Sequence, residues 1–238
     1  MTENNIEQPS HNPDYLGHRK RLREKFIKSI ELKSENTLQD YEILELLLFQ
    51  SIPRGDVRGL AKKLIAKYGS LGQVLSADVN SLKQMKGVGE AVISAIKVAL
   101  ICSLRLIKEE VKEKPLISSW KALIDYCVAQ MKYKKIEEFH IFFFNTKNML
   151  IADEVQNEGT VNHTPVYPRE IVKRALEIGA ASIVLVHNHP SGDFTPSQAD
   201  IDMTQKIQQA TTSVGIEVHD HLIIAGDKYF SFRNKGLL

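Results

Sequence analysis

Two histidines and an aspartate lie close together in the stretch VLVHNHPSGDFTPSQAD, residues 184–200. His187 is the last residue of a β-branched run, SIVLVH, that is typical of a buried central strand, and His189 lies two residues later. Residues i and i+2 of a strand point to the same side, so both imidazoles face one point while Asn188 faces away. We therefore expect His187 and His189 to be able to share one cation.

A carboxylate follows within reach of this pair. Residues 190–192, Pro-Ser-Gly, turn the chain, and a helix predicted from about Pro196 places Asp200 in its first or second turn. Two imidazole nitrogens and one carboxylate oxygen leave the fourth position of a tetrahedral zinc site open, as in catalytic zinc sites. Water in that position has its pKa lowered to about 7 and is a nucleophile at neutral pH.

The same residues also have a purely structural interpretation. Thr195 followed by proline is a good helix start, and Ser197-x-x-Asp200 matches a capping pair. An aspartate near a helix N-terminus also complements the helix dipole. Two histidines at this spacing are by themselves weak grounds for a metal site.

The whole string is more specific than its parts. It matches HxHPxxxxxxSxxD, the JAMM signature of MPN-domain metallopeptidases, at every fixed position: His187, His189, Pro190, Ser197 and Asp200. With GTVNHTPVYPREIVKRALEIGAASIVLV before it and DHLIIAGDKYFSF after it, the string resembles the RadC family over nearly the whole chain from about Gly17. The resemblance implies a zinc hydrolase in which His187, His189 and Asp200 bind Zn²⁺ and Ser197 helps to stabilise the oxyanion.

The resemblance also implies a glutamate as general base, just before the first strand of the domain. The segment IEEFHIFF offers Glu137 and Glu138, and the alignment of the strand favours Glu137, two residues before Phe139. The alternative is that both are solvated charges at a helix end. A carboxylate in this place takes a proton from the attacking water and later delivers it to the leaving amine.

A second histidine pair lies in VHDHLII, where His219 and His221 flank Asp220. These residues also resemble the family's sequence, but the resemblance implies no ligand role for them. Buried, hydrogen-bonded histidines are the expected outcome, and the same holds for the isolated His140 and His163.

Upstream of this domain the pattern is helical. Apolar residues recur at helical spacing from Leu22 to Leu104, and glycines and prolines separate the runs. The charged, proline-containing stretch EEVKEKPLISS is the best candidate boundary. We predict an α/β protein with three parts: a disordered tail over residues 1–16, an all-helical bundle over 17–112, and a mixed α/β JAMM (MPN) domain with a central β-sheet over 117–238.

The segment LKQMKGVGEAVISAI resembles a helix-hairpin-helix. The turn at Gly87 and Gly89 leaves backbone N–H groups free at the start of the next helix, with Lys83 and Lys86 as nearby cations. Such a turn binds DNA phosphates without reading the base sequence. Alternatively, glycine only permits a tight turn between helices. Residues 1–114 carry 19 Lys and Arg against 15 Asp and Glu, and six of these cations lie in GHRKRLREKFIKS, which weakly favours an anionic partner.

The composition argues against a membrane-spanning or secreted protein. The 238 residues are 43% apolar, and no apolar run approaches the roughly 20 residues that span a bilayer. The polar first fifteen residues do not match a secretion signal, so we expect a cytoplasmic protein without a membrane partner. The two cysteines, Cys102 and Cys127, are far apart and suit a reducing compartment.

The leading hypothesis is a zinc-dependent JAMM-type metallohydrolase that cleaves a peptide or isopeptide bond in an unknown protein substrate and is placed on DNA by its helical part. The alternative is a DNA-repair-associated DNA-binding or interaction protein with a non-catalytic metal site. A metal-dependent nuclease ranks last, because phosphodiesterases commonly use two metal ions. The sequence names no substrate and no oligomeric state.

Overall fold

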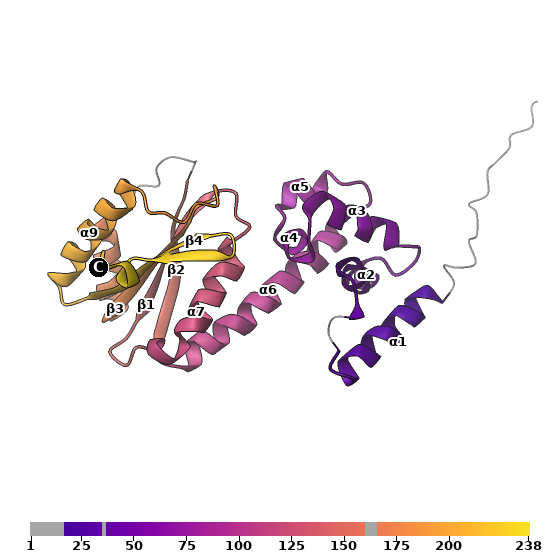
Figure 1. Cartoon of the computed structure of the whole chain (residues 1–238), viewed down its shortest axis with the longest axis horizontal. Helices are drawn as coiled ribbons and strands as arrows, with labels where there is room; N and C mark the ends of the chain where they lie inside the picture. Colours follow the sequence, from indigo (N-terminus) through magenta and orange to yellow (C-terminus); the bar gives the residue numbers. More distant parts are fainter. Residues whose placement is uncertain (1–16, 35–36, 160–165) are drawn as a thin grey trace, which may run out of the picture. The chain divides into compact units, whose positions relative to one another are not determined.

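The computed structural model describes three stretches of the chain, residues 17–34, 37–159 and 166–238. By its contacts the chain forms two compact units, Met1–Leu100 and Ile101–Leu238, and Figure 1 colours it along the sequence. The predicted tail and His163 lie outside the described residues. Within the described stretches, no helix combines the length and apolar character needed to cross a bilayer.

The two units divide inside one helix, α6 (Glu90–Glu113). Its second half belongs to the C-terminal unit, where Val111 is fully buried and Leu104 and Ile107 pack against the same core. The sequence places the domain boundary later, between residues 112 and 117, and that boundary stays a prediction.

The N-terminal unit is built from helices, as the helical spacing of its apolar residues predicts. They are α1 (His18–Glu31), α2 (Asp40–Ser51), α3 (Arg58–Tyr68), α4 (Leu71–Ser76), α5 (Val79–Lys83) and the first part of α6. Their core includes the fully buried side chains of Leu44, Leu48, Leu64, Leu82 and Ile96. Two of the short helices are capped by side chains, Ser70 before α4 and Asp78 before α5, which satisfy backbone N–H groups in their first turns.

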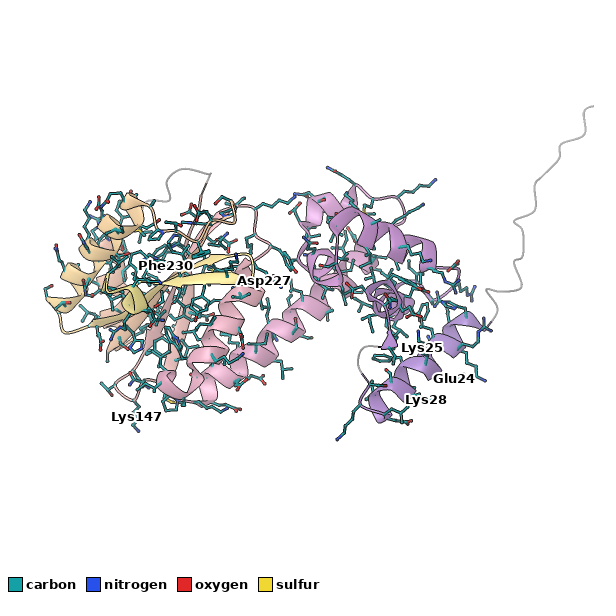
Figure 2. All side chains as sticks on the ribbon, viewed as in Figure 1. Glu24, Lys25, Lys28, Lys147, Asp227 and Phe230 are labelled. Atoms are coloured by element: carbon teal, nitrogen blue, oxygen red, sulfur yellow. The ribbon has the colours of Figure 1, made fainter. Side chains whose placement is uncertain are left out.

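The basic segment at the start of this unit forms α1, where Figure 2 labels Glu24, Lys25 and Lys28. Some of its cations already have partners inside the unit. Lys25 donates to Glu42 of α2 at 2.8 Å, and Arg19 donates to the carbonyl of Gly55 at 3.0 Å. Part of the positive charge therefore helps to hold the helices together.

The predicted hairpin turn lies between α5 and α6. Gly87 has a backbone φ of +90°, a conformation that favours glycine, whereas Gly89 has no positive φ and a side chain there would meet open space. Val88 between them is buried, and Lys83 and Lys86 are exposed. A requirement of the turn itself thus explains Gly87, but not Gly89.

The C-terminal unit contains a five-stranded sheet in the order β2-β1-β3-β4-β5. Its strands are β1 (Glu137–Phe144), β2 (Leu150–Gly159), β3 (Ser182–Asn188), β4 (Glu217–Ala225) and β5 (Lys228–Ser231). Strands β3 and β4 are parallel, and the other neighbours are antiparallel. The mixed sheet confirms the predicted α/β class.

Helices cover both faces of this sheet, and Figure 1 shows α7 and α9 on opposite sides of it. The helices of the unit are α7 (Leu116–Met131), α8 (Pro168–Glu177), α9 (Gln198–Thr212) and a short 3₁₀ turn, Arg233–Lys235. Alternate residues of β3 lie on opposite faces of the sheet. Val184 and Val186 pack in the cluster that contains α7, while Ile183 and Leu185 pack with α8 and α9. Residue 187 therefore faces the α9 side.

One extra residue interrupts the pairing of β3 with β4. Ile183 pairs with Val218, but Val184 pairs with Asp220, so His219 is left out of the register. A bulge of this kind re-aims the side chains that follow it. As a result, Val218 packs on the α9 side and His221 contacts a residue of α9, whereas His219 lies against Trp120 of α7 with ring centroids 5.6 Å apart.

Candidate metal centre

The end of β3 brings His187 and His189 together, as their spacing predicts. Their Nε2 atoms are 3.0 Å apart, and His187 is fully buried while His189 is partly exposed. The ring of Phe139 on the neighbouring strand stacks on His187, with centroids 6.0 Å apart and planes 17° from parallel. Packing between strands thus fixes the direction of the first imidazole.

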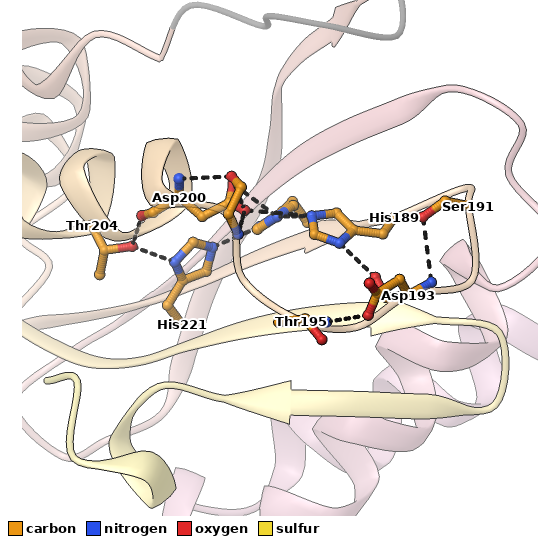
Figure 3. A network of polar contacts seen from close by, with 9 residues as sticks. His189, Ser191, Asp193, Thr195, Asp200, Thr204 and His221 are labelled. Carbon is orange, nitrogen blue, oxygen red and sulfur yellow. Dashed lines mark hydrogen bonds and ion pairs between the residues drawn. The ribbon is translucent and has the colours of Figure 1, made fainter.

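Asp200 meets both rings from α9. Its Oδ1 lies 3.3 Å from His187 Nε2, and its Oδ2 lies 3.5 Å from His189 Nε2. One ligand atom from each of the three residues lies within 4.8 Å of the others, and Asp200 is 8% exposed. Figure 3 shows Asp200 and His189 pointing toward one another from helix and loop.

Asp200 is also the third residue of the capping box of α9. Ser197 Oγ accepts from Asp200 N at 3.2 Å, and Asp200 Oδ2 accepts from Ser197 N at 2.8 Å and from Ser197 Oγ at 2.6 Å. The structural and the metal-binding interpretations are therefore compatible, because the cap directs the carboxylate toward the histidines. The single hydroxyl proton of Ser197 points at Asp200 in this arrangement.

Charge and burial act against each other at this carboxylate. Burial alone raises the pKa of Asp200, but the imidazoles of His187 and His189, which can donate to the carboxylate when they are protonated, and the hydroxyl of Ser197 outweigh it and hold the pKa well below its ordinary value. The hydrogen bond with Asp200 in turn raises the pKa of His189, against the opposing effect of burial. The site therefore favours an ionised Asp200.

His189 has a defined proton position. Its Nδ1 lies 2.7 Å from the backbone carbonyl oxygen of Asp193, which can only accept (Figure 3). The proton of a neutral His189 therefore sits on Nδ1, and its Nε2 lone pair points at His187 and Asp200. This is the form in which an imidazole binds a metal.

The two candidate bases lie in different surroundings. Glu137 is on the same strand face as Phe139, which pairs with His187, and the charge of Glu137 contributes to the raised pKa of His189. Glu138 instead contacts His140 Nε2 at 3.1 Å and Lys134 Nζ at 2.7 Å. Glu138 is thus paired with other groups, whereas Glu137 lies on the strand face that carries Phe139.

The two partners of Glu138 also set its ionisation. Burial raises the pKa of Glu138, but the hydrogen bonds with His140 and Lys134 more than compensate, so its pKa is lower than usual. Glu138 and His140 thus form a buried polar pair away from the histidine site.

Asn188 has a role that sequence reasoning missed. Its side chain faces away from the histidines, as expected, and bonds the start of β1: Oδ1 accepts from Glu138 N at 2.8 Å and Nδ2 donates to Ile136 O at 3.0 Å. These two contacts hold the backbone on both sides of Glu137. An asparagine between two histidines at a strand end is the only sequence signal for it.

His221 is buried, as predicted, but it is also part of the site. Its Nε2 lies 2.8 Å from His187 Nδ1, and its Nδ1 lies 2.6 Å from Thr204 Oγ1 (Figure 3). Burial lowers the pKa of His221 well below its ordinary value. Thr204 carries no sequence signal, because a threonine within an amphipathic helix is common.

The fold and this site define the class of the C-terminal unit as a JAB (MPN) domain: a family described as "RadC-like JAB domain" matches residues 117–237. A second family, described as "UPF0758 N-terminal", matches residues 15–94. A UPF0758 protein of Ruegeria pomeroyi is 50% identical over 227 residues, which cover 95% of this chain and 100% of the relative. A UPF0758 protein of Rhodobacter capsulatus is 49% identical over 217 residues, which cover 91% and 100%.

The chain therefore belongs to the RadC-like UPF0758 family, and the resemblance seen in its motifs is confirmed.

Proposed function

We propose that the chain is a zinc-dependent hydrolase of the JAMM type that cleaves peptide or isopeptide bonds, with His187, His189 and Asp200 as the zinc ligands. The observation that carries the proposal is the convergence of two imidazole nitrogens and a carboxylate within 4.8 Å. Nitrogen and oxygen donors in this number are those of catalytic zinc sites.

The electrostatics support a cation at this point. When both rings carry their proton on Nδ1, the two Nε2 lone pairs, 3.0 Å apart, repel each other, and an ionised carboxylate beside them adds negative charge. A cation between the three groups converts this repulsion into attraction, and it matches the largely buried position of His187 and Asp200. A bound zinc ion would polarise a carbonyl group and lower the pKa of water to about 7.

The protein's own groups then divide the remaining work. Glu137, whose two backbone neighbours are bonded by Asn188, would accept a proton from water and return it to the leaving amine. Ser197 orients Asp200, and its hydroxyl is the group that the family resemblance implies for the oxyanion.

Metal analysis with matched variants tests this proposal. Zinc-loaded wild-type protein is expected to hold about one ion per chain, and His189→Ala and Asp200→Asn should lose it. His219→Ala is the control, because this histidine lies against Trp120 on the other face of the sheet. Equal zinc in His189→Ala and wild type would refute the metal site.

Hydrolysis is tested separately with casein and an isopeptide-linked model peptide, with and without chelator. Glu137→Gln should keep its zinc and lose turnover, because it removes only the proton acceptor. Loss of zinc in Glu137→Gln would contradict its assignment as base.

A non-catalytic, DNA-associated role is the second candidate. No positive φ and no close neighbour requires glycine at position 89, just before α6, and Lys83 and Lys86 in the preceding segment are exposed. Phosphate contact through Lys83, Lys86, Gly87 and Gly89 predicts binding that ignores DNA sequence and weakens steeply with salt. Full zinc occupancy without hydrolysis, together with salt-sensitive DNA binding that Lys83→Ala plus Lys86→Ala weakens, would favour this second function.

A further inference from the structure

A chain of hydrogen bonds joins the back of His187 to the helix that carries Asp200. It runs from His187 Nδ1 to His221 Nε2 (2.8 Å), from His221 Nδ1 to Thr204 Oγ1 (2.6 Å), and from Thr204 Oγ1 to the backbone oxygen of Asp200 (2.6 Å). All three side chains are almost completely buried. This series of hydrogen bonds thus joins His187 and Asp200, whose Nε2 atom and carboxylate meet in the candidate metal centre.

We propose that His221 and Thr204 are positioning residues that hold His187 in its Nδ1–H form, with the Nε2 lone pair directed at the metal. This inference rests on the proposed function, because it assigns a purpose to contacts behind a proposed zinc ligand. It adds two residues that neither the signature motif nor the ligand geometry identifies.

The direction of each hydrogen bond follows from the chemistry of its last acceptor. A backbone carbonyl only accepts, so the hydroxyl of Thr204 must donate to Asp200 O. Its single proton is then used, and Thr204 Oγ1 can only accept from His221 Nδ1. The proton of His221 therefore lies on Nδ1.

The next step fixes His187. A neutral imidazole carries one ring proton, so His221 Nε2 is an acceptor, and His187 Nδ1 must supply the proton between them. A neutral His187 then presents its Nε2 lone pair to His189 and Asp200. Metal-bound histidines commonly donate their other N–H in this way, which fixes both the tautomer and the orientation of the ring.

The fold holds His221 in this position from several sides. The bulge at His219 turns His221 toward α9, and the ring of Phe232 stacks on it with centroids 4.6 Å apart and planes 22° from parallel. The preceding Asp220 accepts from the backbone N–H of His221 at 2.7 Å and from Ser231 Oγ. The imidazole therefore has little freedom to rotate or flip.

The test compares two threonines of the same helix. Thr204→Val removes the hydroxyl that accepts from His221 and keeps the side-chain shape. Thr211→Val is the control, because Thr211 is equally buried in α9 but, within the described residues, its hydroxyl bonds only to Gln208 O of the same helix. Zinc affinity is measured on the full chain by competition with a chelating dye, and the unfolding of the metal-free proteins shows that both variants fold.

We expect Thr204→Val to weaken zinc binding by about 10-fold or more, and Thr211→Val to bind as wild type does. His221→Gln should bind zinc more tightly than His221→Leu, because its amide can accept from His187 and donate to Thr204. A zinc affinity of Thr204→Val equal to that of Thr211→Val would overturn the proposal while leaving the zinc site intact. No zinc binding by wild type would instead refute the proposed function.

A second measurement reports the proton position without metal. In ¹⁵N-labelled, metal-free protein, multiple-bond ¹H–¹⁵N correlations distinguish the two ring nitrogens of each histidine. We expect His221 as the Nδ1–H form in wild type and in Thr211→Val, and a loss of this single form in Thr204→Val. A role in packing alone would not move this signal, and an Nε2–H form of His221 in wild type would overturn the proposal.

Discussion

Ser197→Ala tests how the cap of α9 orients Asp200 in the candidate metal centre. The change removes one hydroxyl that accepts from Asp200 N and donates to Asp200 Oδ2. Loss of an N-cap side chain costs about 1 kcal/mol, and a hydrogen bond to a charged group contributes about 1.5–3 kcal/mol. Because Ser197 N still donates to Oδ2, we expect a net loss of about 2 kcal/mol in the free energy of unfolding of the metal-free protein.

This loss is measurable by thermal unfolding. A change of about 2 kcal/mol lowers Tm by roughly 4–8 °C in a domain of this size. Ser213→Ala is the matched control, because Ser213 follows the same helix and its exposed hydroxyl donates to the backbone oxygen of Ala210. Ser197→Thr keeps a capping hydroxyl and should restore most of the stability.

Zinc affinity separates two roles of the same serine. If the hydroxyl chiefly orients Asp200, Ser197→Ala should weaken zinc binding by about 10-fold or more. If it chiefly stabilises an oxyanion, zinc binding stays unchanged and only kcat falls, by about 100-fold or more. The short Ser197–Asp200 contact leads us to expect the first result, and unchanged zinc affinity with lost turnover would refute that reasoning.

Three further predictions follow from buried groups. Asn188→Ala should lower kcat at least about 10-fold without loss of zinc, because it frees the backbone around Glu137; zinc loss equal to that of a ligand variant would contradict this. Because the pKa of Glu138 is lowered in the folded protein, its contribution to stability is present above its unfolded pKa of 4.5 and is lost as pH falls through the lower folded value. On acidification, urea unfolding should therefore show that the wild type loses more stability than Glu138→Gln. Equal losses of stability in the two proteins would refute this prediction. A thiol reagent should modify the exposed Cys102 in the native protein and Cys127 only after unfolding, because burial raises the pKa of Cys127; rapid native reaction of both thiols would show that Cys127 is accessible.

Local sequence patterns were sufficient to predict the positions of His187, Asn188, His189 and Asp200. The alternation of a strand places His187 and His189 on one side and Asn188 on the other. The helix start after Ser197 brings Asp200 back toward the strand end. Both predictions depend only on residues within one strand–turn–helix segment, where backbone geometry follows from neighbouring residues.

Contacts between segments far apart in the chain could not be predicted from these local patterns. His219 and His221 look equivalent in VHDHLII. They lie on different faces of the sheet, however, because the bulge leaves His219 without a pairing partner in β3. The partnership of Asn188 with the start of β1 depends on the antiparallel register of β1 and β3, residues about fifty positions apart in sequence. Local propensity contains no information on such pairings.

The sequence by itself therefore determined the mixed α/β class, the family and the His-His-Asp group that converges at the candidate metal centre, because these depend on short-range periodicity and on a contiguous signature. Only the tertiary structure showed that Glu138 pairs with His140 and Lys134, and that His221 and Thr204 form hydrogen bonds on the Nδ1 side of His187. The physical reason is that strand register, a single bulge and the packing of α9 set these positions, and each depends on residues far apart in the chain.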